Sequence, residues 1–197
     1  MTAPGASPSN TPNATRQAGA RHVVLFGLMA SGKSTIGRLL AERLGRAFLD
    51  NDAVLQERTG QTAREIAATD GVDGLHHREA EALVASRQSP VPAVIGAAAA
   101  APFEPLAGAA LRDQSTGRFP GVLAVYLHVR PEVLVARLQR EPDDGHRPFT
   151  AADAPAVLAA QYAARDPGYR ALAALVVEAG DSTPDAVVDE ISAALAG

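Results

Sequence analysis

Several residue types are scarce in this chain, and each scarcity narrows the classes of protein to which it can belong. The 197 residues include no cysteine, which excludes disulfide bonds and thiolate metal sites. No apolar run approaches the roughly 20 residues that a membrane-spanning helix needs. The net charge of -4 and the lack of basic clusters argue against nucleic-acid binding, which depends on neutralising phosphates. We therefore expect a cytoplasmic monomer with no membrane or nucleic-acid partner.

Lysine is almost absent, and its one occurrence lies in a motif. Lys33 is the single lysine in the chain, within "GLMASGKST" at 27–35. The segment fits G-x-x-x-x-G-K-[S/T] and lies between a predicted strand and a predicted helix, as this phosphate-binding motif requires. In such a loop the backbone amides face the phosphates, and the lysine reaches the β- and γ-phosphates. We therefore predict an ATP site made by Gly27, Ala30, Ser31, Gly32, Lys33, Ser34 and Thr35, with Ser34 also binding Mg²⁺. A glycine-rich turn with an incidental surface lysine is the less favoured alternative.

The chain is long enough for one domain with a full core, whereas two domains would be cramped. Residues 1–20 contain Pro, Ser, Asn, Thr and Ala with almost nothing large and apolar. Such a segment buries too little surface to offset the entropy lost on ordering. We therefore predict a disordered tail at 1–20 and a single domain at 21–197.

Short apolar runs alternate with helix-period segments along the predicted domain. Five runs are typical of buried strands, at 22–27, 47–50, 92–98, 121–129 and 174–179. Helices are predicted at 32–45, 62–68, 74–87, 131–140, 153–173 and 184–196. Their ends carry recognisable signals, which are Gly45, the Thr62 and Glu65 capping box, Pro131 and Pro184. Interleaved strands and helices indicate an α/β fold in which helices cover both faces of a parallel sheet.

The segment "GLMASGKSTIGRLLAERLGRAFLDND" resembles the opening of shikimate kinases, in the nucleoside monophosphate kinase-like branch of the P-loop fold. The resemblance extends over about residues 22–197 and implies a three-layer sandwich whose five parallel strands have the order 2-3-1-4-5. In this family the second strand ends in Asp-x-Asp, which matches Asp50 to Asp52. The resemblance implies that Asp50 helps to hold hydrated Mg²⁺, and that Asp52 binds the acceptor hydroxyl and accepts its proton. The alternative that one of these aspartates is merely a helix N-cap stays open.

Two arginines in the second half of the chain also match positions of the family. Arg147 in "RPF" lies where the family has a lid arginine, and the resemblance implies that it closes over the phosphates and stabilises the transferring charge. Arg165 in "RDPGY" resembles the family's R-x-P-x-Y, whose arginine grips the substrate carboxylate. An ordinary loop arginine at 147, and a helix-terminal cation beside a proline stop at 165, are the bland alternatives.

The acceptor half of the site departs from the family in two places. Leu75 and His76 replace the family's Phe-Arg pair, so a second carboxylate-binding arginine is missing. Arg78 is two positions further along the helix and therefore lies on another face. Ala98, Ala99 and Ala100 replace a triple-glycine loop, and alanine disfavours positive φ, so that the shape of the pocket and the path of its backbone are expected to differ. We count His76, Ala98 and Ala99 as candidate acceptor-binding residues, with Asp52 and Arg165.

These residues together predict an ATP-dependent small-molecule kinase with Lys33, Asp52 and Arg147 as catalytic residues and with ATP and Mg²⁺ as cofactors. Shikimate is the favoured acceptor, because Asp52 and Arg165 both keep the family's positions. Other acceptors, such as a sugar acid or a cyclitol, remain open, as does a nucleotide-binding regulator with a degraded acceptor site. A scaffolding protein is disfavoured, because the phosphate loop is intact.

Overall fold

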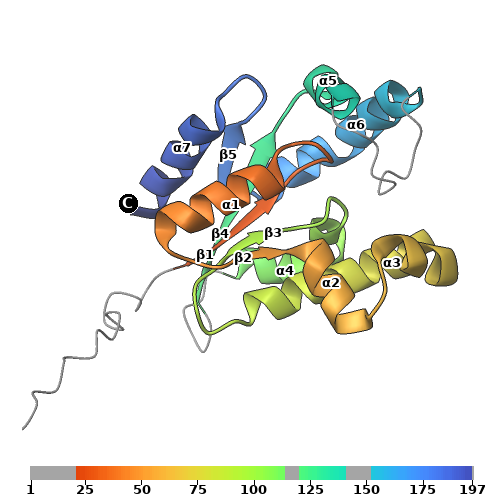
Figure 1. Cartoon of the computed structure of the whole chain (residues 1–197), viewed down its shortest axis with the longest axis horizontal. Helices are drawn as coiled ribbons and strands as arrows, with labels where there is room; N and C mark the ends of the chain where they lie inside the picture. Colours follow the sequence, from red (N-terminus) through yellow and green to blue (C-terminus); the bar gives the residue numbers. More distant parts are fainter. Residues whose placement is uncertain (1–20, 114–119, 141–151, 197) are drawn as a thin grey trace, which may run out of the picture.

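The computed structural model describes residues 21–113, 120–140 and 152–196. The tail predicted at 1–20 lies outside these residues. Five strands form one sheet at the centre of the molecule (Figure 1). They are β1 (His22–Phe26), β2 (Phe48–Asp50), β3 (Val94–Gly96), β4 (Val122–His128) and β5 (Leu175–Glu178). All neighbouring strands are parallel and their order is β2-β3-β1-β4-β5, which confirms the predicted architecture.

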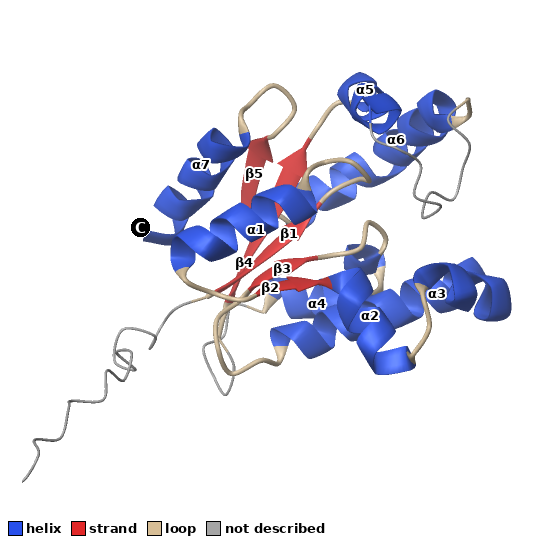
Figure 2. Cartoon of the chain, viewed as in Figure 1, coloured by secondary structure: helices blue, strands red, loops and turns tan. Residues whose placement is uncertain are grey.

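The helices form the two outer layers of the sandwich (Figure 2). On one side α1 (Lys33–Leu44) packs against α7 (Pro184–Ala196) and against β1, β2 and β3. On the other side α3 (Ala63–Arg87), α4 (Pro105–Arg112) and α6 (Ala154–Leu172) contact the sheet. The remaining helical segments are α2 (Asn51–Thr59), which packs on α3, α5 (Pro131–Arg140), which packs on α6, and the short 3-10 helix η2 (Ala101–Phe103).

Most helix ends follow the local signals of the sequence. Gly45 ends α1 with φ of 61°, and the Thr62 and Glu65 side chains form the expected capping box. Pro131 and Pro184 are the first residues of α5 and α7. The predicted helices at 62–68 and 74–87 belong to one element, α3, which is interrupted by a non-helical residue at Gly71. The segments α2, η2 and α4 were not predicted, because each has nine residues or fewer and offers little sequence from which to recognise a helix.

The core lies on both sides of the two central strands, β1 and β4, in which every residue is buried. Three aromatic rings anchor α6 to these strands: the ring of Tyr126 lies 6.0 Å from that of Phe26 and 4.9 Å from that of Tyr169. Because Tyr169 belongs to α6, this contact fixes the helix over the carboxyl ends of the strands, which is the edge where parallel α/β sheets bind ligands. No helix in the described residues is long and apolar enough to span a bilayer.

Candidate active site

The loop between β1 and α1 is built to receive an anion. Gly32 precedes the helix with φ of 97°, a conformation that glycine adopts without strain, and no side chain caps the first turn of α1. The free amides and the dipole of the helix therefore point at the loop. The Lys33 ammonium donates hydrogen bonds to the carbonyl oxygens of Gly27 at 3.0 Å and Leu28 at 2.9 Å, so its charge is held over the same loop.

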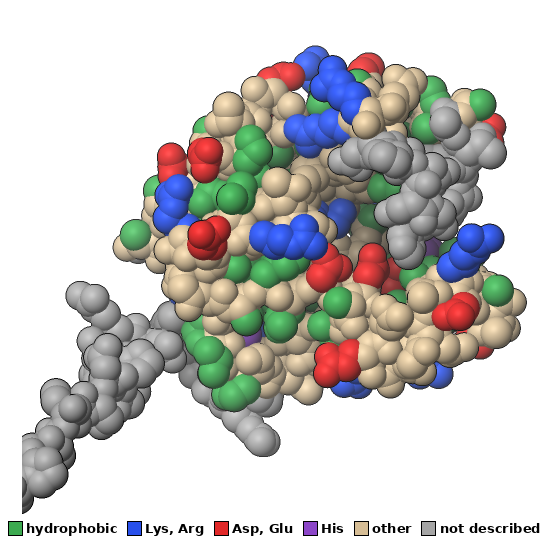
Figure 3. All heavy atoms as spheres, viewed as in Figure 1, with side chains coloured by type: hydrophobic (Ala, Val, Ile, Leu, Met, Phe, Trp, Pro, Cys, Tyr) green, Lys and Arg blue, Asp and Glu red, His purple; other side chains and the backbone are tan. Residues whose placement is uncertain are grey.

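A cleft of about 460 Å³ opens directly in front of this loop. It is lined by every residue from Ala30 to Thr35, by Arg137 of α5, by Ser182 of the segment between β5 and α7, and by Pro184, the first residue of α7. The face drawn in Figure 3 is hollowed near its centre, with basic and acidic side chains around the hollow. Six of the seven predicted ATP-binding residues thus line one cleft, and Gly27 lies behind it at the end of β1.

Arg137 joins the two sides of the cleft. Its guanidinium donates to the carbonyl oxygen of Ala30 at 3.2 Å, and to those of Ala179 at 2.6 Å and Gly180 at 3.1 Å. Ala30 is a non-glycine residue with a positive φ of 61°, a conformation that costs energy and often marks a binding site. Sequence analysis missed Arg137. The available signal was a cation on a helix whose other face is apolar.

Ser34 and Asp50, the two predicted Mg²⁺ ligands, meet at the edge of the sheet. The Ser34 hydroxyl donates to Asp50 Oδ2 at 3.0 Å, while Asp50 Oδ1 accepts the backbone N-H of Asp52 and so caps α2. Asp50 is therefore the N-cap and a polar partner of the phosphate loop at once, whereas Asp52 lies in the first turn of α2. A hydroxyl and a carboxylate are oxygen ligands of the kind that Mg²⁺ prefers beside a nucleotide, so these residues fit that ion. Across the described ranges, no cluster of three or more His, Cys, Asp or Glu side chains could hold a metal by itself.

Four charged side chains from four helices converge beside the cleft. Burial lowers the pKa of Lys33 to about 8, although the carboxylates of Asp52, Asp50 and Glu79 act in the opposite direction. Burial also raises the pKa of Glu79 to about 7, supported by the charge of Asp52 and opposed by Arg165 and Lys33. These mutual effects place Lys33, Asp52, Glu79 and Arg165 within electrostatic reach of one another. The structure thus brings the candidate catalytic lysine, the candidate acceptor-binding aspartate and the candidate carboxylate-binding arginine into one site.

Glu79 is the residue of this cluster that sequence analysis left out of the site. Its side chain is only 8% exposed, although it belongs to a helix with a water-facing side. The signal in the sequence was the spacing of this acidic residue, which lies four positions before Leu83 and seven before Ser86 and so shares the buried side of α3 with them. His76 lies three residues earlier on α3 and therefore on the same side as Glu79, and it is half-buried. Arg78 instead forms a surface ion pair with Glu81 at 3.2 Å, so it does not replace the missing second arginine.

Arg165 lies in the middle of α6, because the helix continues through Pro167 to Leu172. The alternative that Arg165 is a terminal cation beside a proline stop is therefore wrong. One turn later, the Tyr169 hydroxyl donates to the carbonyl oxygen of Ala99, which ties α6 to the alanine loop. None of Ala98, Ala99 and Ala100 has a positive φ, so alanine is accommodated here without backbone strain. Arg147 lies outside the described residues.

Comparison with known proteins identifies the family of this fold and site. The family model for shikimate kinase matches residues 29–196. The chain belongs to the shikimate kinase family. Shikimate kinase from Pseudomonas entomophila is 38% identical over 172 residues, which are 87% of this chain and 94% of the relative. Shikimate kinase from Burkholderia thailandensis is 34% identical over 174 residues, with 86% and 87% covered.

Solved structures agree with this family assignment. A shikimate kinase from Acinetobacter baumannii in complex with shikimate superposes with a TM-score of 0.80 at 26% identity, covering 93% of this chain and 97% of that one. A gluconokinase from Sinorhizobium meliloti has a TM-score of 0.63 at 22% identity, with 90% and 93% covered, and shares the fold. The prediction of an ATP-dependent small-molecule kinase of shikimate kinase type is confirmed.

Proposed function

We propose that this member of the shikimate kinase family transfers the γ-phosphate of ATP to the 3-hydroxyl of shikimate. The observation that carries the proposal is the convergence of Lys33, Asp52 and Arg165 beside a cleft formed by the phosphate loop. Phosphoryl transfer needs little covalent chemistry from the protein, so an enzyme of this class acts mainly by positioning its substrates and stabilising charge.

The nucleotide half of the reaction is assigned to the cleft in front of α1. The backbone of residues 30–35 and the dipole of α1 receive the phosphates, and the Lys33 ammonium exchanges its two carbonyl contacts for phosphate oxygens. Ser34 and Asp50 would hold Mg²⁺, which neutralises phosphate charge when bound. Thr35 lines the same cleft near the bound phosphates.

The acceptor half is assigned to the far side of Lys33. Arg165 binds the carboxylate of the acceptor through its forked donors, and Asp52 binds the reacting hydroxyl and accepts its proton. We assign His76 of α3, and Ala98 and Ala99 of the loop that follows β3, to the same acceptor pocket. The catalytic role of Arg147 rests on its position in the family motif.

One observation favours an acceptor other than shikimate. His76 stands where the family has a second arginine for the carboxylate, and Arg78 is engaged on the surface with Glu81. Loss of one charged hydrogen-bond partner typically costs about 1.5 to 3 kcal/mol, or roughly 10- to 150-fold in affinity. A different small hydroxylated acid is therefore the alternative substrate. Monomeric state and cytoplasmic location remain predictions from the sequence.

Steady-state kinetics with shikimate, quinate and gluconate decides between these acceptors. Shikimate is expected to be turned over with a raised KM and a largely preserved kcat, which is the pattern of lost uniform binding. Arg165→Ala should raise the KM of any carboxylate acceptor by at least 10-fold or so, whereas Arg43→Ala, which removes an exposed ion pair with Asp189 on α7, should not. No turnover of shikimate beside clear turnover of another acid would replace the proposed substrate. Indifference to Arg165→Ala would remove Arg165 from the site.

A further inference from the structure

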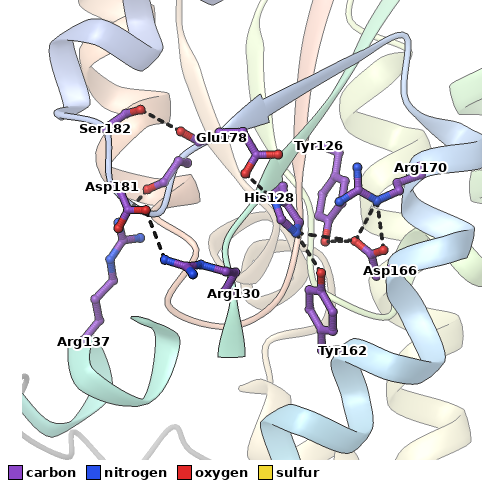
Figure 4. Close-up of polar contacts among 11 residues, drawn as sticks. Tyr126, His128, Arg130, Arg137, Tyr162, Asp166, Arg170, Glu178, Asp181 and Ser182 are labelled. Atoms are coloured by element: carbon purple, nitrogen blue, oxygen red, sulfur yellow. Dashed lines mark hydrogen bonds and ion pairs between the residues drawn. The ribbon is translucent and has the colours of Figure 1, made fainter. Parts of the chain in front are cut away.

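A polar cluster outside the cleft joins the ends of β4 and β5 to α6 (Figure 4). His128, the last residue of β4, is 7% exposed. Its Nδ1 lies 2.6 Å from Glu178 Oε2, and its Nε2 lies 2.9 Å from the hydroxyl of Tyr162. Because an ionised carboxylate only accepts, Nδ1 donates to Glu178. Both ring nitrogens are therefore engaged, one with β5 and the other with α6.

Asp166 makes the second connection between the strand and the helix. Its Oδ1 accepts the Tyr126 hydroxyl at 3.0 Å, and Arg170 Nε donates to Oδ2 at 2.9 Å. The His128 Nε2 lies 3.8 Å from Oδ1. Tyr162 and Asp166 thus attach one side of α6 to β4. Tyr162 lies three residues before Arg165, and Asp166 directly follows it. These contacts hold the part of the α6 backbone from which Arg165 extends.

Pro167 makes these side-chain contacts necessary. A proline inside a helix cannot donate the backbone hydrogen bond to the residue four positions earlier, and its ring crowds that carbonyl. The backbone of α6 is therefore weakened between Ala163 and Pro167, which is the turn that carries Arg165. The ion pair of Asp166 with Arg170 spans the proline from one side to the other.

The same histidine also contacts the wall of the nucleotide cleft. The carbonyl oxygen of His128 accepts the backbone N-H of Ala179 at 2.9 Å, and the carbonyl oxygen of Ala179 accepts from Arg137. Ala179, Arg137 and Ser182 all line the cleft, and the Ser182 hydroxyl donates to the carbonyl oxygen of Glu178. One residue is therefore bonded through its backbone to the nucleotide side and through its ring to the helix of the acceptor side.

We propose that His128 is a positioning residue for the acceptor: its contact with Tyr162 holds the Pro167-weakened turn of α6, and thus Arg165, in register with the nucleotide cleft. The acceptor part of this inference rests on the proposed function. The linkage of α6 to the cleft does not, because it depends only on contacts within this chain. A nucleotide that orders the segment after β5 should consequently order α6 as well.

Two substitutions of His128 separate its two ring contacts. Asparagine places an amide near the position of Nδ1 and removes the Nε2 contact, whereas glutamine reaches the position of Nε2. His128→Asn and Tyr162→Phe should each raise the KM for shikimate roughly two- to ten-fold, the worth of one hydrogen bond, with a smaller change in kcat. The double variant should be no worse than Tyr162→Phe alone, because the contact that His128→Asn removes is already lost in Tyr162→Phe. His128→Gln should restore most of the affinity.

A matched control is provided by His22, which is the other buried histidine among the described residues. Its two ring nitrogens bond to Ser89 and Ala93 at the opposite end of the sheet. His22→Asn should lower stability and leave the KM for shikimate unchanged. Equal KM changes in His22→Asn and His128→Asn would overturn the proposal, since the effect would then be one of general stability. Additive effects of His128→Asn and Tyr162→Phe would overturn it as well.

Hydrogen exchange tests the linkage without any acceptor. ADP should slow amide exchange in α6 around residues 162–170 in the wild type, and this slowing should be lost in His128→Asn while ADP still binds. If wild-type enzyme fails to phosphorylate shikimate but shows this linkage, the proposed substrate is wrong and the positioning role stands. If shikimate is turned over and ADP leaves exchange in α6 unaltered, the positioning role is wrong and the function stands.

Discussion

The ammonium of Lys33 is bound by two carbonyl oxygens of its own loop, so nucleotide binding must exchange these contacts for phosphate oxygens. This exchange should also change the protonation state of Lys33. With a pKa of about 8, Lys33 is largely neutral at pH 9 in the free enzyme, and phosphate charge should raise its pKa in the complex. We expect uptake of nearly one proton when MgATP binds at pH 9 and almost none at pH 7. Calorimetry in buffers of different ionisation enthalpy measures this uptake.

Lys33→Ala is the control for that measurement and a prediction of its own. The variant should lose the proton uptake at pH 9 and should lose phosphoryl transfer, because residues 27–35 contain no other cationic side chain and Arg137 reaches this loop only from α5, where it bonds to backbone carbonyl oxygens. Its circular dichroism spectrum should match that of the wild type, since the side chain bonds to its own loop and supports no core contact. Turnover equal to that of the wild type would exclude Lys33 from the catalytic machinery.

Glu79 makes a prediction about stability because its pKa is raised to about 7 from an ordinary value of 4.5. Between these values the folded protein holds a proton that the unfolded chain has lost, so stability falls as the pH rises through this window. The fall amounts to at most about 3.5 kcal/mol, at about 1.4 kcal/mol per pKa unit. Glu79→Gln should flatten this part of the profile of unfolding free energy measured in urea from pH 5 to 8.

The surface neighbour Glu81 supplies the comparison for Glu79. It lies on the same helix and forms a surface ion pair with Arg78. Glu81→Gln should therefore leave the slope between pH 5 and 7 as it is in the wild type. A slope that is equally steep in Glu79→Gln would mean that another group titrates in this window.

Among the elements, α3 is interrupted at Gly71, and its candidate site residues, His76 and Glu79, lie after this interruption. Gly71 has φ of 75° and ψ of 177°, a region that is essentially open to glycine alone, and a Cβ placed there would meet no other atom within 4 Å. Gly71→Ala should thus cost about 1 to 3 kcal/mol through the backbone only. Because the second part of α3 carries His76 and Glu79, the KM for the acceptor should rise as well. Urea unfolding and steady-state kinetics on the same preparation measure both effects.

Gly45 is the matched position for this test. It has φ of 61° and ψ of 38°, an ordinary left-handed helix cap, also with open space around it. Gly45→Ala should cost about 1 kcal/mol and leave the acceptor KM unchanged, because it ends α1 away from the pocket. If both alanine variants had the same stability and kinetics, the break at Gly71 would have no role in placing α3.

The elements also show where sequence reasoning succeeded and where it failed. The helix ends at Gly45, Thr62, Pro131 and Pro184 were predictable because each signal acts within a few residues. The helix predicted at 153–173 is also confirmed as α6, but the sequence left open a stop at Pro167, because tertiary contacts decide whether a helix continues through a proline, and here Tyr126 and His128 supply them. The backbone of the alanine loop depends likewise on a distant partner, the Tyr169 hydroxyl.

At the scale of the whole molecule, the parallel sheet followed from the alternation of strands and helices, whereas its strand order came from the resemblance to a family. Spacing along the chain cannot supply that order, because it is set by which crossover covers which face. The order matters for the site. It places β1 and β3 side by side and brings Asp50 to the edge where Lys33 lies. Arg137 and Glu79 escaped prediction because their partners are remote in sequence.

The cleft joins the loop after β1 to the segment after β5, two strands that are not neighbours in the sheet, so a ligand in it should stabilise the domain as a unit. ADP at 100 times its Kd should add about 2.7 kcal/mol to the unfolding free energy. For a chain of this length that corresponds to a rise in Tm of roughly 5 to 10 °C. Scanning calorimetry with and without ADP measures this shift.

Lys33→Ala should lose most of the rise in Tm that ADP causes. Arg165→Ala should keep that rise but lose the further rise that shikimate adds. An equal shift with ADP in Lys33→Ala would place the nucleotide elsewhere.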